Sequence, residues 1–359
     1  MSNYIEYNDK IAFHPGYYIK EIVDESGLTQ EDFAKRLDTT PKNLSCIIRG
    51  EQNLSRDMAM KLSRMLGTSV EYWLNIQKKY DAQIAEFESD KELVAEREVF
   101  KYIDYGYFKQ NFSLPELTRK VDEQIKVVRE FLNVATLKVL ANRDLAVSFR
   151  SCSSEPSLSN VINSNTMVQI AINKSLTVDA PKFNKKKFEK ATEYALSLTA
   201  QHEEFFPLIK QAFFDAGVIL IILPNLKNSG INGASKKVGD NIMLMVNDRR
   251  AYSDTFWFTL FHEIGHIMNG DYGMTFSNEK EGKEDAADLY AQSTLIPEAD
   301  YKVFISDRDF SEDAIRDFAK SIKRDPGIIL GRLQNDGLVS YKNISLSNAL
   351  RHKYKIITA

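Results

Sequence analysis

The residues best suited to carry out chemistry lie between Phe258 and Met268, in the stretch FTLFHEIGHIM. His262 and His266 are four residues apart, so on a helix both imidazoles face one side and can bind one metal ion. Glu263 lies between them, in the HExxH pattern in which a glutamate acts as general base toward water activated by zinc. The sequence therefore predicts a Zn²⁺ site with His262 and His266 as ligands and Glu263 as the catalytic base.

The helix that carries this motif is expected to be buried on nearly all sides. Apolar side chains flank the motif in both directions, namely Phe256, Trp257, Phe258, Leu260, Phe261, Ile264, Ile267 and Met268. It costs free energy to bury a histidine or a carboxylate that has no partner. The polar side chains of this motif therefore need a partner such as a metal ion. Gly265 costs a helix interior about 1 kcal/mol relative to alanine, which is tolerable if another element must approach the backbone closely.

A third metal ligand is expected from a second helix further along the chain. The segment 281–297 (EGKEDAADLYAQSTLIP) has apolar residues at helical spacing, and it places Glu284 and Asp288 one turn apart. We predict that Glu284 is the third ligand of the zinc ion. Asp288 would accept a hydrogen bond from the far ring nitrogen of a ligand histidine, which fixes the orientation of the ring.

The motif HEIGH, followed by ExxxD and an AxxxLIP ending, resembles the ImmA/IrrE family of zinc metallopeptidase-like domains. The resemblance implies a zincin-like, thermolysin-type fold in which two histidines and a glutamate from two helices hold the metal. Apolar runs at 216–224, 231–235 and 241–246 predict the strands of its small sheet. An exposed strand there could hold a substrate peptide by main-chain pairing, or the sheet could serve only to support the metal helix.

A second candidate site lies near the N-terminus, where residues 14–80 are expected to form five short helices. Thr29 is a suitable N-cap for a helix at 30–37, and Thr40 for another that begins at Pro41 and ends at about residue 49. Asp38, in the turn between them, tolerates a left-handed conformation. The apolar side chains spaced to pack these two helices together are Phe33, Leu37, Leu44 and Ile47. This arrangement is a helix-turn-helix.

The second helix of this pair directs polar side chains outward, where such a helix contacts base edges when it lies in a major groove. The predicted DNA-binding residues are Gln30, Thr40, Lys42, Asn43, Ser45, Cys46 and Arg49. Residues 1–80 contain eleven Lys and Arg against eleven Asp and Glu, so the segment has no general excess of positive charge. A helical bundle with a merely solvated polar face is the alternative.

Residues 14–81 resemble, over their whole length, the XRE/HigA family of antitoxin and repressor domains. Asp38 departs from the glycine that many relatives have in the turn. The resemblance implies sequence-specific DNA binding by a homodimer on a palindromic operator.

The fold class expected for the 359 residues is multidomain and mainly α, with one α+β domain. Four segments are expected: a helix-turn-helix domain at 1–80, a helical middle region at 81–205, the zincin-like domain with its small sheet at 206–310, and a helical extension at 311–359. Within the middle region we predict helices at 81–98, 113–131 and 185–199, and a loop at 151–165 that is rich in Ser and Asn.

Composition restricts the functional class. The chain is 43% hydrophobic and 27% charged, has no apolar run long enough for a membrane span, and does not begin with the pattern of a signal peptide. Its two cysteines, Cys46 and Cys152, cannot form a disulfide framework, so a cytoplasmic location is expected. A net charge of -3 argues against general adhesion to nucleic acid.

Together these features predict a DNA-binding transcriptional regulator with a zinc metallopeptidase domain. Its expected partners are operator DNA and a protein substrate, which could be a partner repressor, a toxin or the chain itself. The alternative is a non-catalytic, HigA-like antitoxin or repressor whose zinc domain is structural or sensory.

Overall fold

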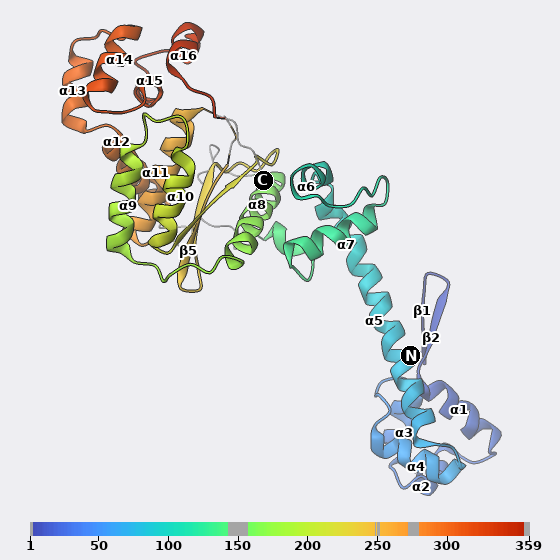
Figure 1. Ribbon diagram of the computed structural model, residues 1–359. Coiled ribbons are helices and arrows are strands. Elements are labelled where there is room, and N and C mark those ends of the chain that lie inside the picture. Colours follow the sequence, from blue (N-terminus) through green and yellow to red (C-terminus); the bar gives the residue numbers. More distant parts are fainter. Residues whose placement is uncertain (1–2, 143–156, 248, 250–251, 272–279, 355–359) are drawn as a thin grey trace. The chain divides into compact units, whose positions relative to one another are not determined.

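The computed structural model describes residues 3–142, 157–247, 249, 252–271 and 280–354, and it is mainly helical (Figure 1). The chain divides into two compact units, Met1–Ala95 and Glu96–Ala359. The long helix α5 (Val70–Phe100) continues from the first unit into the second. The boundary expected after residue 80 therefore falls inside a helix, and the division into four segments stays a prediction.

Helices fill the first unit, and the expected capping residues begin two of them. In chain order the helices before α5 are α1 (Pro15–Glu25), α2 (Gln30–Arg36), α3 (Pro41–Ile48) and α4 (Arg56–Leu66). The Thr29 side chain accepts a hydrogen bond from the backbone N–H of Asp32, and Thr40 accepts one from that of Asn43. Asp38 has a φ of 50° in the turn. The four predicted packing residues are buried in one core with Trp73, so the predicted helix-turn-helix is confirmed.

A β-hairpin precedes these helices and was not predicted. Strand β1 (Tyr4–Tyr7) pairs antiparallel with β2 (Lys10–Phe13). Asn8 and Asp9 connect them with φ values of 46° and 59°, as a two-residue turn of the primed type requires. Two short runs around an Asn-Asp pair are the sequence signal that could have indicated it.

The middle of the chain differs from the prediction in two places. Its helices are α6 (Tyr105–Phe112), α7 (Val121–Leu132), the 3₁₀ helix η1 (Leu137–Ala141), α8 (Leu158–Leu176) and α9 (Lys185–Ser197). The helix expected at 113–131 begins only at Val121, because Ser113 and Arg119 have positive φ values and interrupt it.

The loop expected at 151–165 is wrong from Ser157 onward, while residues 151–156 lie outside the described part of the chain. Ser157 and Asn160 form a capping box that starts α8. Asn163 and Asn165 are buried because their amides donate to the carbonyls of Tyr102 and Leu140. Backbone carbonyls thus satisfy the amide N–H groups of these polar side chains, and a search for apolar periodicity does not find a helix with so many buried polar residues.

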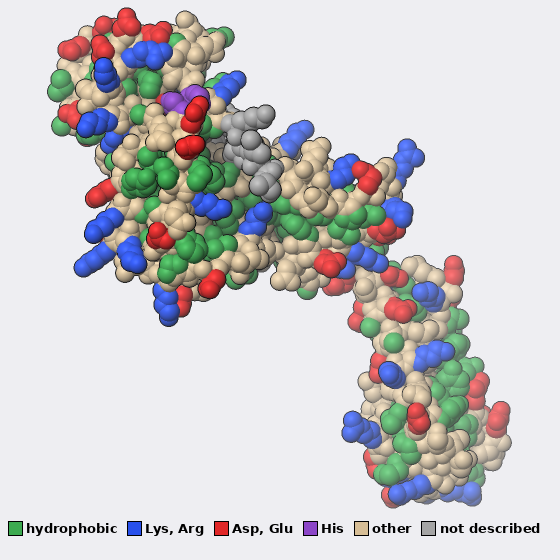
Figure 2. Space-filling model, in the orientation of Figure 1, with side chains coloured by type: hydrophobic (Ala, Val, Ile, Leu, Met, Phe, Trp, Pro, Cys, Tyr) green, Lys and Arg blue, Asp and Glu red, His purple; other side chains and the backbone are tan. Residues whose placement is uncertain are grey.

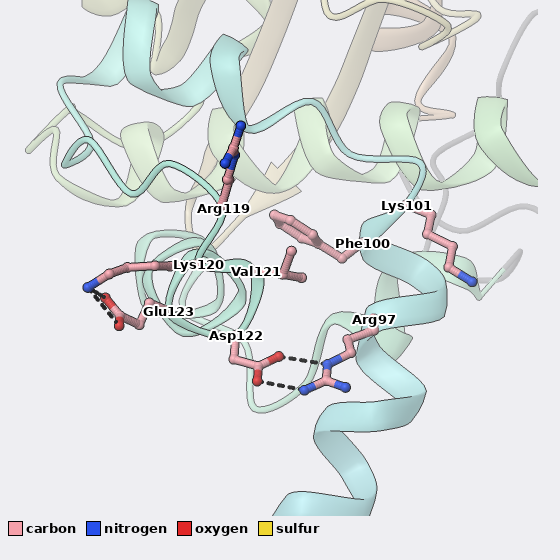
Figure 3. Close-up of a pocket in the computed structure, with 8 residues that line it drawn as sticks. All are labelled: Arg97, Phe100, Lys101, Arg119, Lys120, Val121, Asp122 and Glu123. Atoms are coloured by element: carbon pink, nitrogen blue, oxygen red, sulfur yellow. Dashed lines mark hydrogen bonds and ion pairs between the residues drawn. The ribbon is translucent and has the colours of Figure 1, made fainter.

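Two ion pairs attach the end of α5 to α7, and a hydrogen bond attaches it to η1. Arg97 makes two hydrogen bonds of 2.7 and 2.6 Å to the Asp122 carboxylate, and both residues line an open hollow (Figure 3). Glu96 is completely buried and accepts hydrogen bonds from Arg129 and from the backbone N–H of Leu137. The last turn of α5 is therefore held in the second unit by paired charges.

The second unit contains a three-stranded sheet with the order β3-β5-β4. Its strands are β3 (Val218–Leu223), β4 (Gly233–Val238) and β5 (Asn241–Asn247), where strands were expected. β3 is parallel to β5 and β4 is antiparallel to it, with Gly233 opposite Val246. Helix α8 covers one face, and α10 (Phe205–Asp215) and α11 (Ser253–Asn269) cover the other (Figure 1). Among the described residues β4 pairs only with β5, so its outer side is an edge.

Helix α11 packs along α12 (Lys280–Leu295). The two helices approach each other closely at Gly265, where an added Cβ would lie 3.0 Å from the Cα of Ala287. The expectation that another element passes close to Gly265 is therefore confirmed. The remaining helices are α13 (Glu298–Ser306), α14 (Glu312–Ser321), α15 (Pro326–Asn335) and α16 (Ile344–Leu350). None of the helices described is both long and apolar enough to span a membrane.

Candidate metal centre

The second unit brings together the side chains of His262, His266 and Glu284. One ligand atom from each lies within 4.8 Å of the others. The two histidines are 6% and 5% exposed, one turn apart on α11, and Glu284 faces them from α12. No other group of three His, Cys, Asp or Glu residues among the described positions has this arrangement.

The distances in this cluster are those that a tetrahedral zinc site requires. The two Nε2 atoms are 3.1 Å apart, and the Glu284 oxygens lie 3.3 Å from His262 Nε2 and 3.5 Å from His266 Nε2. Two ligands each about 2.0–2.1 Å from a tetrahedral zinc ion are separated by roughly 3.4 Å. An ion between the three side chains therefore fits without rearrangement.

The Glu284 carboxylate is an independent indication that this cluster suits a cation. Both of its oxygens are buried, and neither accepts a regular hydrogen bond from any described residue. A buried carboxylate without donors is costly, and a metal ion is the partner that this donor set would satisfy. The residues present thus fit a divalent zinc ion by geometry and by charge.

Two further carboxylates hold the far sides of the imidazole rings. Asp288 Oδ1 lies 2.8 Å from His262 Nδ1, the position expected for a residue that orients a ligand. Asp271 Oδ2 lies 3.4 Å from His266 Nδ1, and sequence reasoning missed it. Its signal is the dipeptide Gly270-Asp271: the left-handed Gly270 ends α11, and the backbone N–H of Asp271 returns to the carbonyl of His266.

The electrostatics of the cluster favour a positive charge. Burial acts to lower the pKa of His262, but the carboxylates of Asp288, Glu284 and Glu263 outweigh it and raise the pKa to about 9. A divalent cation bound between the rings would experience the same negative charges and would take the place of the proton.

Glu263 lies beside the cluster rather than in it. Its side chain is buried, and burial raises the pKa of the carboxyl group against the opposing effects of both histidines and a hydrogen bond with Ser235. Gly233 on β4 leaves the necessary space, because a Cβ there would lie 2.8 Å from the Glu263 carboxylate. Thus the edge strand and the predicted base are in contact.

The predicted DNA-binding residues gather around α3 in the first unit. Lys42 and Arg49 are exposed and Ser45 and Cys46 are half-buried, at spacings that place them on one face of the helix. Three positions already make local bonds: Thr40 caps α3, Asn43 donates to Thr39, and Arg49 pairs with Glu51 at 2.8 Å. Gln30 is the first residue of α2 and is half-buried. Basic and acidic side chains are interspersed over this unit (Figure 2).

We predict that Asp288→Asn and Asp271→Asn each weaken zinc binding about 10- to 100-fold, because the asparagine no longer fixes the orientation and basicity of the ligand ring. Competition with a chromophoric zinc chelator measures this loss in the full chain. Asp285→Asn is the matched control, since Asp285 lies on the same helix and is exposed. Equal affinities for the Asp285 and Asp288 variants would contradict the assignment.

Each of the two units contains a region that matches a known protein family. A helix-turn-helix family model matches residues 19–73, and a model of the IrrE N-terminal-like domain, of the peptidase M78 family, matches residues 219–321. The second match includes His262, Glu263, His266 and Glu284. It therefore covers the whole candidate metal centre.

Several individual relatives match the N-terminal region. Virulence-associated protein A' of Dichelobacter nodosus is 44% identical over 80 residues, which are 22% of this chain and 70% of that protein. The uncharacterized HTH-type transcriptional regulator YddM of Escherichia coli is 35% identical over 79 residues, or 21% of this chain and 84% of that protein.

Two solved structures are similar to the same region. An addiction module antidote protein of the HigA family from Coxiella burnetii is 29% identical, and the match covers 24% of this chain and 94% of that one. A putative antidote protein of a plasmid maintenance system from Nostoc punctiforme is 30% identical, and the match covers 22% and 88%. Both have a TM-score of 0.22. The chain thus belongs to the XRE-type helix-turn-helix family of regulators, and it carries in addition an IrrE/ImmA-like domain of the peptidase M78 family.

Proposed function

We propose that this protein is a transcriptional regulator that binds operator DNA as a homodimer and cleaves a peptide bond, in a partner protein or in itself, with a zinc-dependent C-terminal domain. The observation that carries the peptidase assignment is the convergence of His262, His266 and Glu284 beside the buried carboxylate of Glu263. A cluster with only a structural role would not need a fourth side chain beside it that can exchange a proton.

His262, His266 and Glu284 would hold the zinc ion, which as a Lewis acid would lower the pKa of water toward about 7 and polarise a peptide carbonyl. Glu263 takes a proton from the water that attacks the carbonyl carbon and passes it to the leaving nitrogen. Burial supports this role, because it raises the pKa of the Glu263 carboxyl group above its usual value and so makes the group a stronger base.

The outer edge of β4 is the surface on which we place the substrate backbone. The backbone N–H and C=O groups of β4 that do not pair with β5 face outward, so an extended peptide can add as a further strand. Gly233 starts this strand and contacts Glu263, so a peptide paired there would pass beside the base. Main-chain pairing would also hold the peptide straight at the bond to be broken.

Replacement of Glu263 by glutamine tests the mechanism. Glutamine keeps the shape of the side chain but cannot take a proton, so we expect zinc content near that of the unchanged protein and a loss of cleavage of at least about 100-fold, the lower range for general base catalysis. The measurement is mass spectrometry of fragments after incubation of the zinc-loaded chain with itself and with candidate partner proteins. Undiminished cleavage by Glu263→Gln would exclude this mechanism.

A second candidate function is a HigA-like antitoxin or repressor in which the zinc domain is structural or sensory. The similarity of the N-terminal region to antidote proteins favours it. The same incubation separates the two functions: operator binding without any new fragment supports the repressor, and fragments that disappear in the Glu263→Gln variant support the peptidase.

Lys42 is the most informative residue for a test of DNA binding, because it is exposed on α3 and no described residue pairs with it. We expect Lys42→Ala to weaken binding by about 1–3 kcal/mol if it contacts a base edge. Fluorescence anisotropy with a duplex selected from a random pool by the unchanged protein gives the affinity. Lys20→Ala, at an exposed position on α1, should leave binding nearly unchanged. Equal losses for the two variants would indicate only general charge attraction.

A further inference from the structure

The guanidinium group of Arg49, one of the predicted DNA-binding residues, contacts three side chains of its own unit. Its Nε and Nη2 atoms donate hydrogen bonds of 2.9 and 2.8 Å to the two carboxylate oxygens of Glu51. Nη1 donates to Ser45 Oγ, and Nη2 lies 3.8 Å from Cys46 Sγ. Two parallel hydrogen bonds to one carboxylate fix the plane of the guanidinium group as well as its position.

The turn that ends α3 brings Glu51 to Arg49. Gly50 has a φ of 70°, and its N–H donates to the carbonyl of Ile47, while the N–H of Glu51 donates to the carbonyl of Cys46. These two hydrogen bonds define a Schellman motif, in which the residue after the glycine returns to the last turn of the helix. The backbone of Glu51 is therefore held by the helix end itself.

The charged group of Arg49 lies beside the middle of α3, although Arg49 is the C-cap of that helix. Ser45 and Cys46 precede Arg49 by four and three residues, which is one helical turn. Long side chains on a helix lean toward its N-terminus, and the contacts of Arg49 run in this direction. The guanidinium group is thus among the side chains that we predict to face a major groove.

The ion pair lies on the surface, because the side chain of Arg49 is 45% exposed and that of Glu51 is 33% exposed. Exposed ion pairs contribute little to the stability of a fold. Arg49 holds the pKa of the Glu51 carboxyl group below its usual value, so Glu51 is ionised at neutral pH. A carboxylate in this place would repel DNA phosphates and thus restricts what Arg49 can contact.

A guanine base edge is the contact that suits this arrangement. Arginine donates two hydrogen bonds to guanine O6 and N7, and a glutamate accepts from N4 of cytosine. A guanidinium group has more N–H donors than Glu51 and Ser45 use, so donors remain for a base. A phosphate group, in contrast, presents only negatively charged oxygens to the Glu51 carboxylate.

We propose that Glu51 is a specificity-determining residue of the DNA-binding unit, because it holds Arg49 toward a guanine in the major groove and keeps it from the phosphate backbone. This inference rests on the proposed operator binding. It adds a residue outside α3 to the predicted DNA-binding residues and names a base that the operator contains. Glu51 would discriminate through repulsion, since it disfavours the contacts that any DNA sequence offers.

The test compares the base preferences of full-length variants. The unchanged protein, Arg49→Ala and Glu51→Gln each select duplexes from a random pool at one salt concentration, and the bound duplexes are sequenced. We expect the unchanged protein to enrich guanine at one or more positions, and both variants to reduce the enrichment of the same guanine at least about five-fold. Full retention of every guanine preference by either variant would overturn the proposal.

Glu31→Gln is the matched control for the loss of negative charge. Glu31 is an exposed glutamate of the same unit and pairs with Lys35 at 2.9 Å, so its replacement removes an equal charge and a similar ion pair. The guanine preference should persist in this variant. Its loss there as well would indicate a general effect of charge and would contradict the role of Glu51. Because Glu31, Arg49 and Glu51 are exposed, none of the substitutions alters the buried core of the unit.

Salt dependence provides a second readout, which a purely structural role of Glu51 would not change. On a duplex of scrambled sequence, Glu51→Gln frees Arg49 for one phosphate, so we expect several-fold tighter binding. The slope of the logarithm of the association constant against that of the salt concentration should steepen by about 0.9. In the Arg49→Ala background, the same substitution should leave the slope unchanged.

An unchanged slope for Glu51→Gln, or an equal change of slope without Arg49, would overturn the proposal. If the unchanged protein bound no duplex at all, the proposed operator binding itself would be refuted. The two failures are therefore distinguishable.

Discussion

The C-terminal half of this protein depends on one constraint: His262, His266 and Glu284, which we propose as metal ligands, and Glu263, which we propose as general base, are buried close together and must keep their orientation. Two imidazoles and two carboxylates within one small volume are unstable unless a cation and outer hydrogen bonds compensate for the lost solvation. The raised pKa of His262 has the same cause, because the carboxylates around the ring stabilise positive charge more strongly than burial opposes it.

Most of the surrounding features serve this constraint. Gly265 lets α12 approach α11 closely enough for Glu284 and Asp288 to reach the histidines, and Gly233 leaves room for the Glu263 carboxylate beneath the edge strand. The three-stranded sheet supports α11 from one side. Helix α15, near the C-terminus, packs against α11 as well.

The sequence predicted the features that follow from local periodicity, and it failed where distant segments meet. The motif His262 to His266, the pair Glu284 and Asp288, and the caps Thr29 and Thr40 are each contained within one or two helical turns. Asp271 was missed because it lies after the end of α11 and returns to His266 only through the left-handed Gly270. The cavity of the second unit that Asn232, Arg351 and residues of α11, α12 and α15 line could not be predicted at all, since its walls come from at least five separate segments of the chain.

The failures in the middle of the chain have a different cause. Helix α8 carries buried Ser, Asn and Thr side chains, so its sequence has the composition of a loop. Only the fold shows that Asn163, Ser164 and Asn165 donate hydrogen bonds to backbone carbonyls of other segments. A buried helix with many polar residues is therefore predicted as a loop when the hydrogen-bond partners of those residues are not known.

The most direct test of the central claim is a crystal structure of the zinc-loaded protein with data collected on both sides of the zinc absorption edge. The account predicts one strong anomalous peak about 2 Å from His262 Nε2, His266 Nε2 and an oxygen of Glu284, with one coordination position open toward Glu263. A peak at another place, or a site closed by a fourth protein ligand, would contradict it.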